Sequence, residues 1–166
     1  MVEIKVQELS REAFDKYGSY VNLINPVNAV CGGTGHPVAF YRDMLQVPNP
    51  SASLPSFSTC RVEKREMIVA GAEYHGFAYE ANIPLDADML LWVVVSGNGP
   101  CPTEKMECFR IPKGTLVTCH PGVWHGAPFV FDTDVMNTLV VLPEHTYSND
   151  SAREQFDDAR KVKVSF

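Results

Sequence analysis

Residues that could bind a divalent metal ion are concentrated in two stretches of the chain. The first contains Glu73 and His75, two residues apart, and then a second carboxylate, Glu80. Residues i and i+2 of a strand lie on the same face, so Glu73 and His75 are expected to point the same way. A five-residue offset reverses the face of a straight strand. Glu80 can therefore join them only if the chain turns or forms a bulge between Gly76 and Tyr79.

The second stretch, residues 114–125, supplies another imidazole, because the turn sequence His120-Pro121-Gly122 is followed by His125. Two imidazoles and two carboxylates suit Mn, Fe, Ni or Zn as a divalent ion better than the soft thiolate zinc of a structural site. A second interpretation stays open: the histidines could be ordinary core residues and the glutamates charges at the rim of the fold. The full candidate ligand set is Glu73, His75, Glu80 and His125.

Composition limits the class of protein and of partner. A chain of 166 residues without an obvious linker favours one domain, residues 1–166. A net charge of -6 with only 14 Lys+Arg argues against nucleic acid or an anionic membrane as partner. There is no run of eighteen apolar residues and no signal-peptide pattern at the start, so a cytoplasmic protein is expected. The five cysteines show no CxxC spacing and are expected to be reduced thiols.

The pattern of apolar and turn residues predicts an all-β fold. Turn residues separate short expected strands every eight to twelve residues, which is typical of a sandwich or barrel. Residues 90–95 are apolar at every position, as in a strand covered on both faces. A short helix is expected between Ser10 and Gly18, one or two helical turns after Ser151, and a loop or lid over residues 22–55. The expected strands are 2–9, 38–45, 57–62, 67–69, 81–85, 89–95, 107–111, 116–119, 128–131 and 137–142.

Both stretches resemble the two metal-binding motifs of the cupins, which are small double-stranded β-barrels. The second motif resembles Gly114-x5-His120-Pro121-Gly122-x2-His125-x3-Phe129: the opening glycine and the Gly-x2-His core match, the proline is shifted by one residue, and Phe129 stands where the motif has asparagine. The first motif resembles Glu73-x-His75-x4-Glu80, with Glu73 in place of a histidine. The resemblance implies a cupin-like double-stranded β-barrel or jelly roll, with a short N-terminal helix and a short C-terminal helical segment. It also places the metal ligands at these four positions.

Within the cupins, the chain is similar to the ureidoglycolate lyase family, formerly called ureidoglycolate hydrolases. The likeness covers most of residues 2–150 and departs from the family pattern at two positions. Where members commonly have Gln-Ala-Phe-Ile-Pro, this chain has Glu80-Ala81-Asn82-Ile83-Pro84. The added negative charge favours a cation at the site. The matching segments are Leu9-x4-Phe14-x2-Tyr17-Gly18, Glu73-x-His75 with Ala81-x-Ile83-Pro84, Trp92-Val93-Val94-Val95, and His120-x2-Val123-Trp124-His125.

The family resemblance implies cleavage of ureidoglycolate to glyoxylate and urea. A base takes the proton of the carbinol hydroxyl, an acid protonates the departing urea nitrogen, and a metal chelates the carboxylate and the hydroxyl. Glu73 is expected as the fourth ligand or the base, and His120 as the acid. The expected substrate-binding residues are Arg61, Lys113, Trp124 and Tyr79, with Arg61 and Lys113 clamping the substrate carboxylate.

Two other functions stay open at this stage. The barrel could serve an isomerase or an oxygenase acting on another hydroxy or keto acid, since one fold hosts many reactions. It could also be a non-catalytic cupin that binds a metabolite. A homodimer that pairs through edge strands is expected in each case.

Overall fold

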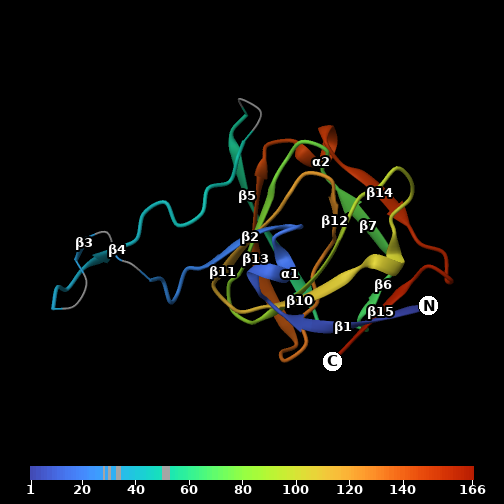
Figure 1. Cartoon of the computed structure of the whole chain (residues 1–166), viewed down its shortest axis with the longest axis horizontal. Coiled ribbons are helices and arrows are strands. Elements are labelled where there is room, and N and C mark those ends of the chain that lie inside the picture. The colour runs from blue at the N-terminus through green and yellow to red at the C-terminus, as the bar shows by residue number, and fades with distance from the viewer. Residues whose placement is uncertain (28, 30, 33–34, 50–52) are drawn as a thin grey trace.

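In the computed structural model, which describes residues 1–27, 29, 31–32, 35–49 and 53–166, two β-sheets curl around a shared core (Figure 1). One sheet has six strands in the order β12-β9-β10-β1-β15-β6, and the other has five in the order β2-β11-β8-β13-β5. β1 lies between β10 and β15 and is parallel to both, while the remaining neighbours in these two sheets are antiparallel.

The strands have these bounds: β1 Val2–Glu8, β2 Gly18–Asn22, β3 Cys31–Gly32, β4 Ala39–Phe40, β5 Pro55–Glu63, β6 Ile68–Val69, β7 Gly71–Tyr74, β8 Glu80–Pro84, β9 Met89–Val95, β10 Glu107–Ile111, β11 Thr115–Cys119, β12 Val123–Trp124, β13 Val135–Pro143, β14 Ala152–Gln155 and β15 Val162–Ser165. The helices are α1 Arg11–Phe14, the 3-10 turn η1 Thr103–Lys105, and α2 Thr146–Asn149. The β-rich class and the two short helices are confirmed. Within the described residues, no helix has the length and apolar character needed to span a membrane.

Strand β9 is covered on both faces, as its unbroken apolar sequence predicts. Leu91 and Val93 point into the core between the two sheets, together with Phe14, Phe109 and Met136. The alternate residues of β9 point into a second core that β6, β7 and β15 cover. Because side chains alternate along a strand, one strand joins the two cores and fixes the sheets relative to each other.

The N-terminal helix is shorter than its sequence pattern predicts. Ser10 caps α1 through its side chain, which accepts a bond from the Ala13 amide at 3.3 Å. The helix ends at Phe14, and Gly18 begins β2 instead of ending the helix. A Cβ at Gly18 would lie 1.6 Å from the carbonyl oxygen of Thr118 on β11, so only glycine allows the two strands to approach this closely.

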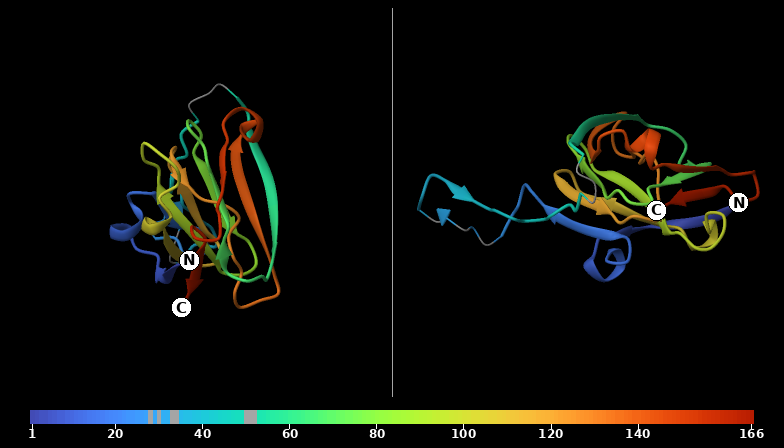
Figure 2. Two further views of the ribbon diagram at one scale, coloured as in Figure 1. Left: turned by 90° about the vertical axis from the view of Figure 1, so that its right-hand side faces the viewer. Right: turned by 90° about the horizontal axis from the view of Figure 1, so that it is seen from above.

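Part of the segment between β2 and β5 projects away from the barrel as an arm that carries the β3–β4 hairpin (Figures 1 and 2). Several apolar side chains of the segment, among them Ile24, Val27 and Phe40, are exposed, while residues 43–49 line pockets with α1, β2 and β13. The strand expected over 38–45 is reduced to Ala39–Phe40. Part of the expected 22–55 loop, including much of the glycine cluster at 32–35, lies outside the described residues.

Two expected elements near the end of the chain are wrong. The residues after Ser151 form strand β14, paired with β7, and the C-terminal helix is α2, which comes before them. Charged residues at helical spacing gave the wrong prediction because the partner strand is distant in sequence. Residues 128–131 form no strand; Phe129 makes only an isolated bridge to Leu90.

The cysteines behave as the sequence predicts. Cys101, Cys108 and Cys119 are buried free thiols and Cys60 is partly buried, while the side chain of Cys31 lies outside the described part of the chain. Burial raises the pKa of Cys101 and of Cys108 to about 12, so both stay protonated and unreactive near neutral pH.

We expect Gly18→Ala to lower the free energy of unfolding by about 2 kcal/mol or more, because the added methyl group overlaps a backbone oxygen of β11. Urea denaturation measures the change. Gly97→Ala is the matched control, since a Cβ there meets no atom within 4 Å, and it should change stability by less than about 0.5 kcal/mol. Equal stability of the two variants would contradict the close approach of β2 and β11.

Candidate metal centre

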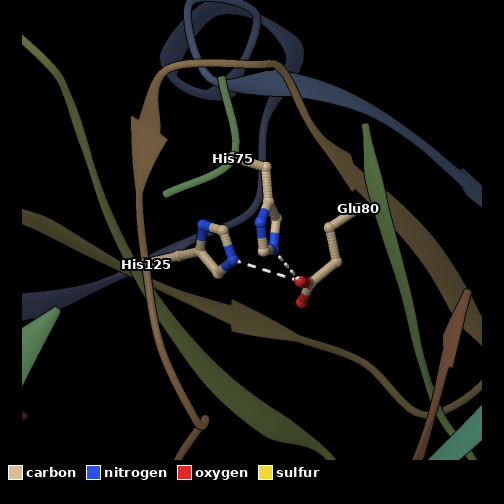
Figure 3. A group of neighbouring side chains, drawn as sticks. All are labelled: His75, Glu80 and His125. Atoms are coloured by element: carbon tan, nitrogen blue, oxygen red, sulfur yellow. Dashed lines mark hydrogen bonds and ion pairs between the residues drawn. The ribbon is translucent and has the colours of Figure 1, made fainter. Parts of the chain in front are cut away.

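Three buried side chains converge on one point in the barrel (Figure 3). The Nε2 atoms of His75 and His125 lie 3.1 Å and 3.2 Å from the same oxygen of Glu80, Oε2. One potential ligand atom from each residue falls within 4.8 Å of the others. The three residues are between 2% and 7% exposed. Among the described residues, this is the group whose geometry could hold a metal ion.

Each member of the group sits at the end of a strand. His75 follows β7, Glu80 is the first residue of β8, and His125 follows β12. The chain makes the turn between 76 and 79 that the spacing of Glu80 requires. The Gly122 amide donates to the His75 carbonyl at 2.7 Å, with Gly122 at a φ of 78° that favours glycine. This bond ties the first stretch of the sequence to the second.

Asp150 fixes the turn that brings Glu80 to His75. Its carboxylate accepts bonds from the amides of Gly76, Phe77 and Ala78 at 2.6, 2.9 and 2.8 Å. Burial alone would raise the pKa of Asp150, but these three bonds outweigh it and lower the pKa. The backbone carbonyl of the same residue lies 2.6 Å from Nδ1 of His75. One residue therefore holds both the turn and the imidazole.

The hydrogen bonds of the imidazoles define which nitrogen faces the carboxylate. Nδ1 of His75 lies against the Asp150 carbonyl, and Nδ1 of His125 lies 2.8 Å from the Val123 carbonyl. A carbonyl only accepts, so each Nδ1 is assigned the proton, and a neutral ring then directs its Nε2 lone pair at Glu80. Two neutral rings would thus set two lone pairs against a carboxylate oxygen, so the group needs positive charge, which a proton on an Nε2 atom or a bound cation would supply.

The pKa shifts of His125 and Glu80 also show that the group favours positive charge. Burial would lower the pKa of His125, but the charge of Glu80 and the bond to it raise the pKa to about 9. Burial would likewise raise the pKa of Glu80. The charge of His125 and the bonds from His125, His75 and Asn82 outweigh it and hold that pKa well below its usual range. Two imidazole nitrogens and a carboxylate oxygen suit Mn, Fe, Ni or Zn, so the residues present fit a divalent metal ion.

Glu73 lies outside this group, unlike the arrangement that its spacing from His75 suggests. Its backbone pairs with that of His125, at 2.9 and 2.8 Å. Its carboxylate accepts from Arg153 Nε at 3.0 Å and from Ser151 Oγ at 3.2 Å. β7 ends at Tyr74, so the strand alternation does not extend to His75, and the partners of Glu73 are Arg153 on β14 and Ser151 just before it.

The remaining predicted site residues occupy two other regions. His120 and Tyr79 contact each other, with ring centroids 5.7 Å apart, and the His120 amide donates to the Tyr17 carbonyl. Trp124 is buried in the second core against Tyr74, on the side of β12 opposite to Val123, which packs in the first core. His120, Tyr79 and Trp124 are close in sequence to the ligands of the centre, but the contacts described here join them to other residues.

The two expected carboxylate clamps lie on the outside of the barrel. Arg61 is exposed and pairs with Glu63 on the same strand. Lys113 is also exposed and sits in the turn before β11, where its amide donates to Asp88 at 2.8 Å. Position near a predicted strand did not reveal on which face of the sheet each side chain lies.

Three residues that contact the centre have no role among the sequence-based predictions. They are Asn82, which donates to Glu80; Asp150, which holds the turn; and Tyr147, whose ring lies 6.2 Å from that of His75. The role of Asn82 could have been predicted from the sequence, because side chains alternate along a strand and residues 80 and 82 therefore lie on the same face of β8. The role of Asp150 could not have been predicted, because its three hydrogen bonds join residues that are 72 to 74 positions apart in the sequence.

We expect Asp150→Ala to destabilise the fold by about 2 to 3 kcal/mol, because three amides lose a charged acceptor. The amides of Phe77 and Ala78 should then exchange with solvent deuterium faster than in the wild type. Asp157→Ala is the matched control, since Asp157 also accepts two backbone amides, at 3.0 Å, in a separate turn. Unchanged exchange at residues 77 and 78 in Asp150→Ala would refute the assigned role.

Solved structures resembling the chain have the cupin-like fold that the sequence predicts. A dTDP sugar isomerase from Desulfovibrio desulfuricans G20 matches with a TM-score of 0.51 and 16% identity, over 78% of this chain and 81% of that one. QdtA, a sugar 3,4-ketoisomerase from Thermoanaerobacterium thermosaccharolyticum, matches with a TM-score of 0.49 and 13% identity, over 82% and 87%. At 16% identity the first likeness shows the fold alone.

The sequence itself identifies the family. Comparison with curated protein sequences gave no significant match. The family model described as ureidoglycolate lyase matches residues 1–164, which is nearly the whole chain and includes all three residues of the buried group. The chain therefore belongs to the ureidoglycolate lyase family.

Proposed function

We propose that this protein is a metal-assisted lyase that cleaves ureidoglycolate, or a closely similar ureido adduct of a small α-hydroxy acid, to glyoxylate and urea. The observation that carries the proposal is the buried group of His75, Glu80 and His125 in a member of this family. Burying such a group destabilises the folded protein unless a cation neutralises it. Destabilising groups of this kind are found mainly at functional sites.

His75, Glu80 and His125 would hold the ion, each through one atom. A divalent ion bound there would polarise the substrate carboxylate and hydroxyl and make the hydroxyl easier to deprotonate. In the reaction, the carbinol O–H gives its proton to a base, the carbon–nitrogen bond breaks as the aldehyde carbonyl of glyoxylate forms, and the urea nitrogen takes up a proton. The residues of the barrel have to supply the base and the acid.

Glu73 is the proposed base. Its backbone is bonded to that of the ligand His125, and its carboxylate, which is partly exposed, can accept a proton. The proposed acid is His120, which contacts Tyr79. Arg153 is better placed than Arg61 or Lys113 to bind the substrate carboxylate, because it is already bonded to Glu73.

A cavity of about 340 Å³ lies beside two of these residues, Glu73 and Arg153. Arg65, Trp92 and Phe129 also line it, whereas the three proposed ligands and His120 do not. A lining of two arginines, a carboxylate and two aromatic rings suits a small carboxylic acid.

A second reaction remains a candidate because of the donor set itself. Two histidines and one carboxylate are the ligands of many non-haem iron oxygenases. An iron-dependent oxygenation of a small hydroxy or keto acid is therefore the alternative. Oxygen uptake by the Fe²⁺-loaded protein in the presence of such acids, without urea release from ureidoglycolate, would favour it.

We expect His75→Ala to lose metal content and to release urea from ureidoglycolate at least about 100-fold more slowly than the wild type, because one of three ligands is gone. Metal is measured by elemental analysis of purified protein, and urea by a coupled assay. His36→Ala, an exposed histidine in the arm, is the matched control and should change neither quantity. Equal metal in His75→Ala and the wild type would refute the ligand assignment. Urea release that survives exhaustive chelation would remove the metal from the reaction.

A further inference from the structure

The two oxygens of the Glu80 carboxylate have different surroundings. Oε2 faces the Nε2 atoms of both imidazoles. Oε1 accepts a bond of 2.8 Å from Nδ2 of Asn82, an asparagine that is only 4% exposed. Glu80 and Asn82 lie two residues apart on β8, so their side chains share one face of the strand. The carboxylate is thus oriented before any ligand binds.

We propose that Asn82 is a positioning residue that restricts Glu80 to binding the metal through Oε2 alone. The inference rests on the proposed metal site. The Asn82 amide binds one lone pair of Oε1 and fixes the plane of the carboxylate, so turning the carboxylate to offer both oxygens to an ion would bend or break a buried hydrogen bond. Such a bond is costly to break because the freed polar atoms have no solvent to replace it.

The backbone around Asn82 leaves the amide little freedom to move. β8 lies between β11 and β13, and Asn82 is paired in register with Val117 on one side and Val140 on the other. A side chain on a central strand keeps its direction more firmly than one on a loop. Asparagine also suits the role chemically, because its NH₂ group donates to a carboxylate while adding no charge that would compete with the metal.

The consequence for the site is a set of three single-atom donors. A divalent ion held by two imidazole nitrogens and one carboxylate oxygen retains open positions. Those positions are what an α-hydroxy acid requires, since it presents two oxygens, one from the carboxylate and one from the hydroxyl. A carboxylate that bound through both oxygens would occupy one position more.

The test compares Asn82→Leu with a matched variant elsewhere in the molecule. Asn137 also donates through Nδ2 to a carboxylate, that of Asp86, but on the exposed side of the fold. We expect Asn82→Leu to bind Mn²⁺ about 10- to 100-fold more weakly than the wild type, and Asn137→Leu to bind it equally well. The visible absorption spectrum of the Co²⁺-loaded protein should change in Asn82→Leu alone, since it reports the ligand geometry.

A purely structural role for Asn82 would lower the melting temperature of the metal-free protein and leave the Co²⁺ spectrum unchanged. Should Asn82→Leu fail to fold, Asn82→Ala removes the same donor with a smaller side chain and is measured in its place. Mn²⁺ affinity in the variant that equals or exceeds that of the wild type, with an unchanged Co²⁺ spectrum, would overturn the inference and leave the proposed function intact. A wild-type protein that binds none of Mn²⁺, Fe²⁺, Ni²⁺ or Zn²⁺ would overturn both.

Discussion

The structure depends on the burial of one carboxylate, that of Glu80. Removing such a group from water costs several kcal/mol unless charge and hydrogen bonds replace the lost solvent. Here two imidazoles face one oxygen and an amide caps the other. The partners lie directly after β7, on β8 and directly after β12, so the segments that supply them have to meet at one place. The bond from the Gly122 amide to the His75 carbonyl and the three bonds to Asp150 serve that purpose.

The two apolar cores make this arrangement rigid. β9 packs on one core through Leu91 and Val93 and on the other through Leu90 and Trp92, and β12 divides its two residues between the cores in the same way. His125 follows β12 directly, so its position is fixed by packing on both faces of the sheet. A site held in this way needs little rearrangement to bind an ion.

Much of the fold could be predicted from local sequence signals. The strands expected at residues 89–95 and 107–111 have the observed bounds of β9 and β10. Continuous or alternating runs of apolar residues are strong evidence for strands. The place of His75, Glu80 and His125 in one group followed from residue type and spacing. Other features depend on pairing between distant residues, which leaves no local trace. Thus β14 was expected to be helical, and Glu73 was expected beside the metal although its carboxylate bonds Arg153. The two departures from the family pattern, at Glu80 and Asn82, are adjacent in space and bonded to each other.

The position of β1 between β10 and β15 has a consequence for how the protein is made. Val2 pairs with Val162 and Val6 with Cys108, so β1 finds its neighbours only among much later residues of the chain. Contacts of such wide sequence separation form slowly, because the chain must close long loops before they stabilise it. The turn that carries Glu80 likewise waits for Asp150. During synthesis, the turn and the His75 imidazole can therefore be held as observed only after residue 150 has been added to the chain.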